Sequence, residues 1–381
     1  MPVDPDAFLE RQVGDADQFA WSLLRLADAG KSNALVSPLG ARRVFGMVYL
    51  GARGATETGL ARALDAADPD AFAAGESSTR ASLNLVGGST TLEIADSVWL
   101  NSDWTMLDSW RRRCRTNFGD GELSRRFGAG AVKDINAWVA RRTHGRISRL
   151  IESLSSDDKA VLLDAIYFKG LWSNPFPRRS TKIEDFHSSS GKVVRRPRMR
   201  VGGDFDYAET DGLQIVRLPY QDGRLSMTIL LPAKGRRLEP LLAAMSGARW
   251  RGLLSRLKFT EGVVEIPRFK FDATVSLKAP LSALGAADAF DRARADFGAM
   301  ARARRPEDRL YISRAEQKAV IAVDEKGTVA VAATGVVAET VGARMADMEH
   351  PFVFTADRPF LFAVGDRQTG ALLFVGVVRD P

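Results

Sequence analysis

Residues 324–335 read D-E-K-G-T-V-A-V-A-A-T-G, and this stretch decides how the rest of the chain is interpreted. Small side chains recur in it at every second position, namely Thr328, Ala330, Ala332 and Thr334. Alternate side chains of a β-strand share one face, so the stretch is suited to place small residues against a packed interior. It nevertheless lies in a run to about Met348 that is rich in Gly, Ala, Thr and Glu, as a loop is. A strand-like segment inside a loop-like run predicts a chain that inserts into a sheet after folding.

The length and composition are those of one large domain. The chain has 381 residues, of which 45% are hydrophobic, and this is ample for a large core. Hydrophobic segments run from Phe19 to Val378 without a Pro/Ser-rich linker, a low-complexity tract or an internal repeat. We therefore expect a single domain over residues 1–381.

The charge pattern does not identify a ligand. The formal net charge is +7, with basic and acidic residues interspersed. Basic runs occur at Arg111–Arg115, Arg195–Arg200 and Arg302–Arg305. Each run is interpreted as a solvated helix face or loop, with weak binding of a polyanion as the alternative.

Features of an exported or membrane protein are not found in the sequence. Its single cysteine, Cys114, excludes an intrachain disulfide and any multi-cysteine metal site. The N-terminal residues have no apolar core of a signal peptide, and no run of about 18 apolar residues occurs. The cytoplasm is the default expectation for the compartment, with leaderless export left open, and no membrane partner is expected.

Hydrophobic periodicity places helices mainly in the first third of the chain. Residues 15–29, 37–50 and 132–142 have helical spacing, with Ser37 and Pro38 opening the second helix. Residues 160–168 are apolar on both faces apart from Asp164, which indicates a central strand. Further strands fit residues 92–100, 213–218, 225–231, 263–266, 319–323, 359–364 and 372–378. Helices followed mainly by strands favour an α+β fold over alternating βαβ units.

The chemistry of an enzyme is not apparent. The histidines are His144, His187 and His350, none of them in H-E-x-x-H, and there is no G-x-S-x-G elbow or Walker motif. Gly128-Ala129-Gly130 lacks both the third glycine and the preceding strand of a dinucleotide site. We therefore expect no catalytic residues, no cofactor and no metal.

Segments along nearly the whole chain together resemble the serpins, the large superfamily of protease inhibitors. Each segment alone is weak, but their order and spacing are specific. They are S-N-A-L-V-S-P-L-G (32–40), M-V-Y-L-G-A-R-G-A-T (47–56), D-S-V-W-L (96–100), I-N-A-W-V (135–139), L-L-D-A-I-Y-F-K-G-L-W (162–172), L-P-Y (218–220), S-M-T-I-L-L-P (226–232), I-P-R-F-K (266–270), A-D-F (295–297), V-D-E-K-G-T (323–328) and D-R-P-F-L-F (357–362).

The resemblance implies a fold and a mechanism. The fold has three β-sheets, eight or nine helices and an exposed reactive loop, here at about residues 325–348. A serine protease cleaves the loop as a substrate, and the loop inserts as a new strand in the largest sheet before the acyl-enzyme hydrolyses. The implied partner is a target protease, held in a covalent acyl complex by a monomeric inhibitor.

The hinge of this loop distinguishes inhibitory from non-inhibitory members. In the family, small residues throughout the hinge mark the inhibitors, and Gly327 is expected to permit the sharp backbone change where the loop leaves the sheet. The alternative is a flexible loop in a non-inhibitory serpin that acts as a carrier or binding protein. The hinge residues here are Glu325, Gly327, Thr328, Ala330, Ala332, Ala333 and Thr334.

The family position of the scissile bond, counted from Glu325, falls at Val341-Gly342. A small apolar residue before the bond suits an elastase-like or subtilisin-like protease. Arg344-Met345 is the alternative, because the loop is longer than usual and arginine suits the carboxylate-containing pocket of a trypsin-like protease. Glu339 would serve only a glutamate-preferring protease.

The region that controls opening of the large sheet departs from the family pattern. A helix-cap serine, a strand asparagine and a histidine are usual there, and the residues here are Ser37, Asp164 and Gln317. A buried aspartate needs donors, which Ser37 and Gln317 would supply. The second serine of the family's S-P-x-S motif is Gly40. Trp172 matches the aromatic residue where the loop first enters, although ordinary core packing would explain it equally.

Overall fold

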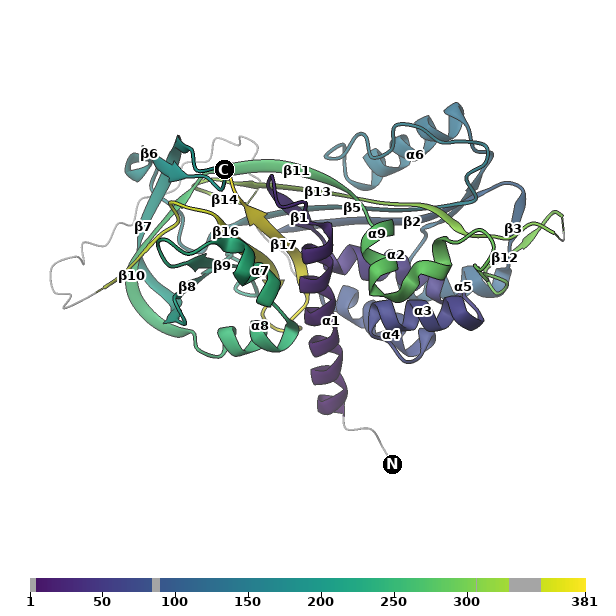
Figure 1. Ribbon diagram of the computed structural model, residues 1–381, viewed down its shortest axis with the longest axis horizontal. Helices are drawn as coiled ribbons and strands as arrows, with labels where there is room; N and C mark the ends of the chain where they lie inside the picture. Colours follow the sequence, from purple (N-terminus) through teal and green to yellow (C-terminus); the bar gives the residue numbers. More distant parts are fainter. Residues whose placement is uncertain (1–4, 84–89, 306, 329–350) are drawn as a thin grey trace.

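The computed structural model describes residues 5–83, 90–305, 307–328 and 351–381, and only the backbone of residues 5–15. The helices are α1 (Pro5–Ala27), α2 (Pro38–Tyr49), α3 (Gly54–Leu64), α4 (Pro69–Leu83), α5 (Asp108–Phe118), α6 (Ala129–Arg142), α7 (Leu238–Ala244), α8 (Gly247–Leu254) and α9 (Lys278–Leu281). Short helical turns are η1 (Arg178–Ser180), η2 (Ser282–Ala286) and η3 (Ala287–Phe290). Figure 1 shows long strands running most of the length of the molecule, with α2 to α6 and α9 in one half, α1 in the middle, and α7 and α8 in the other half.

The six-stranded sheet supplies these long strands. Its order is β11 (Phe269–Ser276), β13 (Ile312–Val323), β14 (Gly327–Thr328), β5 (Ala160–Leu171), β2 (Thr91–Asn101) and β4 (Glu122–Arg125). Strand β5 is antiparallel to β2 and parallel to β13. Its side chains are buried on both faces over almost the whole strand, as expected for a central strand.

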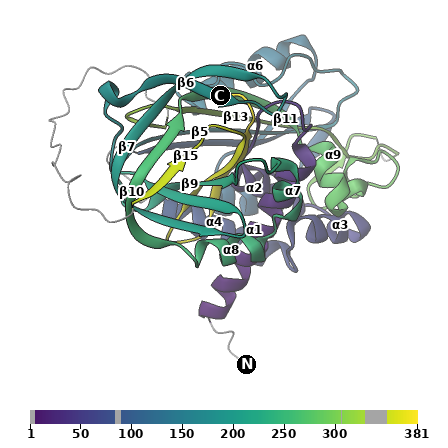
Figure 2. The same ribbon diagram turned by 60° about the vertical axis from the view of Figure 1, so that its left-hand side comes forward.

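The nine-stranded sheet curls around the other end of the molecule (Figure 2). Its order is β1 (Ala34–Val36), β17 (Leu372–Val378), β16 (Phe360–Asp366), β9 (Leu225–Pro232), β8 (Leu213–Pro219), β7 (Val193–Thr210), β10 (Lys258–Pro267) and β15 (Phe352–Thr355), with β6 (Lys182–His187) paired to β7. A third, two-stranded sheet joins β12 (Ala301–Ala303) to β3 (Trp104–Met106).

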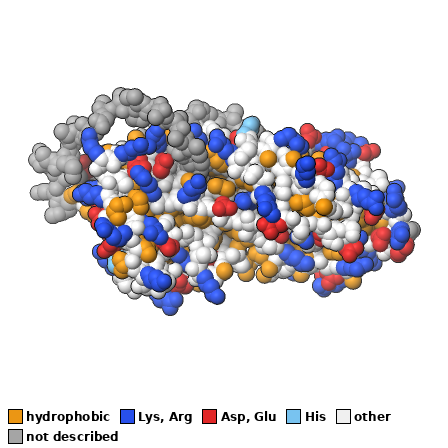
Figure 3. Space-filling view, turned by 90° about the horizontal axis from the view of Figure 1, so that it is seen from above, with side chains coloured by type: hydrophobic (Ala, Val, Ile, Leu, Met, Phe, Trp, Pro, Cys, Tyr) orange, Lys and Arg blue, Asp and Glu red, His pale blue; other side chains and the backbone are white. Residues whose placement is uncertain are grey.

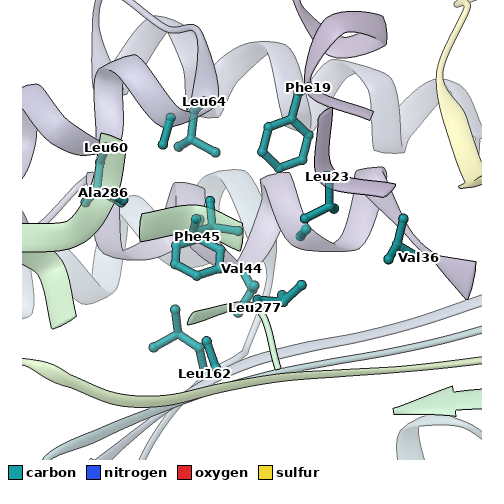
Figure 4. Packing of buried hydrophobic residues seen from close by; sticks show 14 of the residues in the cluster. Phe19, Leu23, Val36, Val44, Phe45, Leu60, Leu64, Leu162, Leu277 and Ala286 are labelled. Carbon is teal, nitrogen blue, oxygen red and sulfur yellow. The ribbon is translucent and has the colours of Figure 1, made fainter. Parts of the chain in front are cut away.

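Both faces of the six-stranded sheet are covered. On one face α6 packs through Ile135 and Trp138 against β2 and β5. On the other face helices α1 to α3 pack over Leu162 of β5, where Phe45 and Leu277 meet (Figure 4). Farther along β5, Ile166 and Phe168 pack against the nine-stranded sheet. This covering is nearly complete around β5, whereas the outward side chains of β11 are exposed.

The expected α+β class with three sheets is confirmed. One expectation about local structure is wrong. The run Arg195–Arg200 lies within strand β7 and not in a helix or loop. Its basic side chains at positions 196, 198 and 200 alternate along the strand and meet acidic residues, so the charge pattern hides a strand.

Candidate functional site

Strands β13 and β5 separate at one end of the six-stranded sheet. They pair directly from Ile312 with Ala160 to Val320 with Tyr167. Beyond that point β14 lies between them and is antiparallel to both, with Thr328 opposite Val323 on one side. The first hinge residues after the turn at 324–327 therefore already occupy the position of a strand.

A tight turn reverses the chain between β13 and β14. The backbone N of Asp324 donates to the carbonyl of Gly327 at 2.9 Å, and Oδ1 of Asp324 accepts from the backbone N of Lys326 at 2.8 Å. Glycine is required at position 327, but not for the sharp backbone change that the sequence predicted. Its φ lies outside the left-handed region, but a Cβ there would overlap the carbonyl oxygen of Gly170 on β5. Only glycine lets β14 lie this close to β5.

Thr328 points into the core, where it meets two aromatic side chains. It is 1% exposed, and its hydroxyl lies 2.6 Å from that of Tyr220. Tyr220 stacks on Trp172 with ring centroids 4.7 Å apart. The indole Nε1 of Trp172 donates to the carbonyl of Asp324 at 3.0 Å. Trp172 thus holds the turn that precedes the hinge as well as filling the core.

Glu325 is anchored to the body of the protein. Arg268 donates through Nε to both carboxylate oxygens, at 2.8 and 2.9 Å, and through Nη2. The hydroxyl of Thr181 donates to Oε1 at 2.7 Å, and the backbone N of Phe176 to the carbonyl of Glu325 at 2.9 Å. Burial opposes ionisation of the carboxyl, but the donors from Arg268 and Thr181 outweigh it and lower the pKa of Glu325.

Acid is expected to weaken this anchor. Because the pKa of folded Glu325 lies below the ordinary value of 4.5, the ionised carboxylate contributes its full stability above that pH and loses it as the pH falls through the folded pKa. We expect Glu325→Gln to lose less free energy of unfolding than the wild type between about pH 5 and 3, measured by denaturant titration. The exposed Glu261→Gln is the matched control. The same acid profile in the wild type and Glu325→Gln would contradict this role.

Ser37, Asp164 and Gln317 come together in the middle of the sheet, as the resemblance implies. The Gln317 side chain bridges them: Oε1 accepts from the Ser37 backbone N, and Nε2 donates to the Ser37 carbonyl, both at 2.8 Å. Nε2 also donates to Oδ2 of Asp164 at 2.5 Å. The Ser37 hydroxyl caps α2 by accepting from the Gly40 backbone N at 3.1 Å. Gln317 therefore supplies the expected donor to Asp164, whereas the recorded Ser37 bonds go to Gln317 and Gly40.

Sequence reasoning did not find the acidic and basic neighbours of Asp164. Asp96 on β2 is its register partner, and Nε of Arg43 on α2 donates to Oδ2 of Asp96 at 2.7 Å. The Arg43 side chain is fully buried. Asp96 lies in the quoted motif D-S-V-W-L. The sequence signal for this acidic pair was the presence of one aspartate in each of two strands that were expected to be apolar.

Gly40 provides the space that Asp164 occupies. A Cβ at position 40 would overlap the Asp164 carboxyl group. We expect Gly40→Ala to lower the free energy of unfolding by about 1–3 kcal/mol, as overpacking of a core does. Denaturant titration checks this, with Gly130→Ala on exposed α6 surface as the control, where a Cβ meets nothing within 4 Å. Equal stability of Gly40→Ala and the wild type would contradict the prediction.

The remaining loop residues lie outside the described part of the chain. They are Ala330, Ala332, Ala333 and Thr334 of the hinge, Glu339, and the candidate bond residues Val341, Gly342, Arg344 and Met345. Their assigned roles stay predictions.

Many arginines of the basic runs are paired with acids. Figure 3 shows basic and acidic side chains interspersed over one face of the molecule. Arg113 lies 2.7 Å from Asp70, and Arg115 lies 2.5 Å from Glu122. Arg200 lies 2.8 Å from Glu265. These pairs lower the local positive potential that a polyanion would meet.

The described residues contain neither a group of metal ligands nor a membrane-spanning helix. Among them, no group of three or more His, Cys, Asp or Glu side chains is arranged to hold a metal ion. No helix in the described part of the chain is long and apolar enough to span a membrane. Burial is the main factor that raises the pKa of the Cys114 thiol, which is therefore unreactive.

The fold and the site define an α+β protein whose loop hinge lies between two strands of a large sheet. The family model described as "Serpin (serine protease inhibitor)" matches residues 15–381, and the chain belongs to the serpin family. That description is of inhibitors and not of enzymes.

Individual relatives agree with this assignment. Leukocyte elastase inhibitor of Sus scrofa is 32% identical over 382 residues, which cover 96% of this chain and 98% of the relative. The native structure of the thermophilic serpin tengpin superposes with a TM-score of 0.90 at 24% identity, covering 100% of this chain and 96% of that one. Human thyroxine-binding globulin with its thyroxine gives a TM-score of 0.86 at 24% identity, covering 98% and 99%. At this identity the two structures bear on the fold alone.

Proposed function

We propose that the chain is a single-domain, monomeric suicide inhibitor of serine endopeptidases. A protease cleaves the reactive loop, and the loop inserts between β13 and β5 while the acyl-enzyme bond is intact. The position of β14 carries this proposal, because Thr328 already pairs with both strands and Gly327 pairs with β5. Insertion then requires only that the existing strand grow, and no new nucleus has to form.

The register of β14 on β5 predicts where later hinge residues would lie. Thr328 faces Gly170, and the two strands are antiparallel. Thr334 lies six positions after Thr328, and Gly170 lies six positions after Asp164. Continued pairing would therefore place Thr334 opposite Asp164, with its side chain on the same inward face as that of Thr328.

The register on β13 gives the same result independently. Thr328 faces Val323, which lies six positions after Gln317. The inserted Thr334 would separate Gln317 from Asp164, and its hydroxyl is able to replace the amide as a partner of the Asp164 carboxyl. Two separate ladders thus predict one register in which the inward residues 328, 330, 332 and 334 are all small.

The energetics favour insertion of these residues. About ten added residues would form a ladder worth about 1 kcal/mol net per hydrogen bond, or on the order of 10 kcal/mol. A buried unpaired charge would cost about 3–5 kcal/mol, and no inward hinge residue carries one.

The reactive bond is proposed to be Val341-Gly342, with Arg344-Met345 as the alternative. The named target of the elastase-inhibitor relative agrees with a small apolar residue at the bond. We expect a covalent complex with an elastase-like or subtilisin-like protease that survives denaturing electrophoresis, and a released C-terminal peptide that begins at Gly342. A peptide that begins at Met345, released by a trypsin-like protease, would instead identify Arg344-Met345 as the reactive bond. Cleavage by every protease of the panel without a covalent complex would overturn inhibition.

A carrier function is the second candidate. Thyroxine-binding globulin in complex with thyroxine has the same fold, so the fold alone does not distinguish a carrier from an inhibitor. A carrier that does not insert its loop would be cleaved without a covalent complex and without a gain in thermal stability. Weak polyanion binding is the least favoured addition, because many of the arginines concerned are paired with acids.

A further inference from the structure

Two acidic side chains meet in the middle of the six-stranded sheet. Asp96 on β2 and Asp164 on β5 are directly opposite in an antiparallel ladder, so their side chains share the face that α2 covers. Asp164 is fully buried, and Asp96 is 8% exposed. In each, the buried Oδ1 has no hydrogen-bond partner among the described residues. Two orphaned acceptors at one register position require an explanation.

The two arginines near the pair, Arg43 and Arg80, make a single recorded hydrogen bond to it and donate otherwise to backbone carbonyls. Nε of Arg43 donates to Oδ2 of Asp96, while Nη1 and Nη2 donate to the carbonyls of Glu76 and Phe118, at 3.4 and 3.2 Å. Arg80 on α4 is close enough for its charge to act on Asp96, but its Nη1 also donates to the Phe118 carbonyl. The recorded arginine bonds therefore stabilise one carboxylate, that of Asp96, and none reaches Asp164.

Gln317, the neutral residue that faces Asp164 from β13, already uses both of its amide hydrogens in hydrogen bonds. The two hydrogens of Gln317 Nε2 are directed at the Ser37 carbonyl and at Oδ2 of Asp164. Gln317 has no further donor to offer to Oδ1 of either aspartate. A single proton between the two Oδ1 atoms would satisfy both of them.

We propose that Asp164 is a neutral carboxylic acid in the native protein and that its proton, shared with Asp96, latches β5 to β2 in the middle of the sheet. In this state Oδ1 of Asp164 donates to Oδ1 of Asp96, and Oδ2 accepts from Gln317. The pair then carries one negative charge beside Arg43. Burial, followed by the charge of Asp96, raises the pKa of Asp164 well above its ordinary value, in agreement with this state.

The latch makes the stability of the sheet fall as the pH rises above the ordinary pKa of an aspartate. Because the pKa of Asp164 is raised in the folded protein, its contribution to stability is complete below the ordinary value of 3.8 and is lost as the pH rises through the folded pKa. Within that window each pH unit changes the unfolding equilibrium by up to about tenfold per group. Loss of the proton leaves two buried carboxylates facing each other with one arginine bonded to the pair.

The consequence for loop insertion rests on the proposed function. An entering strand must break the contact between Gln317 and Asp164. The shared proton joins β5 to β2, on the other side of β5. Ionisation of Asp164 would therefore weaken the sheet beside the entering strand, and not the Gln317 contact that the strand must break.

The test compares Asp164→Asn with the wild type in the full chain. Asparagine is the neutral isostere: its amide nitrogen donates to Asp96 and its oxygen accepts from Gln317. The control is Asp17→Asn, since Asp17 is also buried, pairs with Arg251 at 3.3 Å and has its pKa raised by burial to about 7. Denaturant titration across neutral and alkaline pH gives the unfolding equilibrium of each variant, and infrared spectroscopy gives the carbonyl stretching band of protonated carboxyls.

We expect the infrared spectrum of Asp164→Asn to lack part of the wild-type carboxylic acid band. We also expect its unfolding equilibrium to change less with rising pH than that of the wild type, by up to about tenfold per pH unit. Asp17→Asn should remove a different part of the band. An unchanged band and an unchanged pH slope in Asp164→Asn would overturn the proposal. If Asp164→Asn does not fold, the infrared spectra of the wild type and of Asp17→Asn are compared at pH 7. The absence of any carboxylic acid band in the spectrum of Asp17→Asn would overturn the proposal. Neither measurement uses a protease, so failure of the latch is distinguishable from failure of inhibition.

Discussion

Thr328→Arg is expected to abolish the covalent complex and to leave a chain that target proteases cut as an ordinary substrate. Thr328 is buried against Tyr220 between β13 and β5, and every later hinge residue must follow it into the sheet. Because β14 is already in the sheet of the intact chain, an arginine at this position would expel β14, and re-entry of the unpaired charge during insertion would cost about 3–5 kcal/mol. Since insertion competes with hydrolysis of the acyl-enzyme, this cost predicts at least about a hundredfold loss of complex.

The measurement is the ratio of covalent complex to cleaved chain on denaturing electrophoresis. Val329→Arg is the matched control, because strand alternation predicts that residue 329 falls on the opposite face of the inserted strand. It should retain most of the complex. Equal amounts of complex from Thr328→Arg and the wild type would contradict the prediction.

The sequence was sufficient for the fold class and for the neighbourhood of the hinge. Alternation of small residues is a local pattern, so it could be recognised without knowledge of any partner. The motif around Ser37 and the isolated Asp164 also predicted a shared location, and Gln317 does bridge the two. These inferences depend on spacing along the chain or on a family pattern.

Contacts between distant segments could not be predicted in this way. Arg268 lies 57 positions from Glu325, and Tyr220 lies 108 positions from Thr328. Each residue stands in a quoted motif, but only the sheet register brings it to the hinge. The reason for Gly327 was likewise not local, because it is the Gly170 carbonyl on another strand that excludes a side chain.

The pairing of Asp96 with Asp164 in the middle of the sheet was the hardest feature to predict. Asp96 and Asp164 are 68 positions apart, and their pairing depends on the register of β2 on β5. A slip of one residue would place them on opposite faces. Gly40 appeared only as a departure from a family pattern, and its role became clear once the Asp164 carboxyl was found in the space of its missing side chain.

Cleavage of the reactive loop is expected to raise the melting temperature by about 10 °C or more. Insertion would add about ten residues to the ladder between β13 and β5, at about 1 kcal/mol per hydrogen bond. In a chain of 381 residues each kcal/mol shifts the melting temperature by about 1 °C, so a gain on the order of 10 kcal/mol corresponds to about 10 °C. Scanning calorimetry of the intact and cleaved wild type would measure the shift.

Cleaved Thr328→Arg is the control that separates insertion from cutting. Its loop would be severed at the same bond, but the arginine would oppose entry between β13 and β5. We therefore expect a much smaller gain in melting temperature for the cleaved variant than for the cleaved wild type. If both gained equally, the stabilisation would come from relief of the intact loop and not from the new strand. If neither gained, the chain would not insert its loop, and the carrier function would be favoured over inhibition.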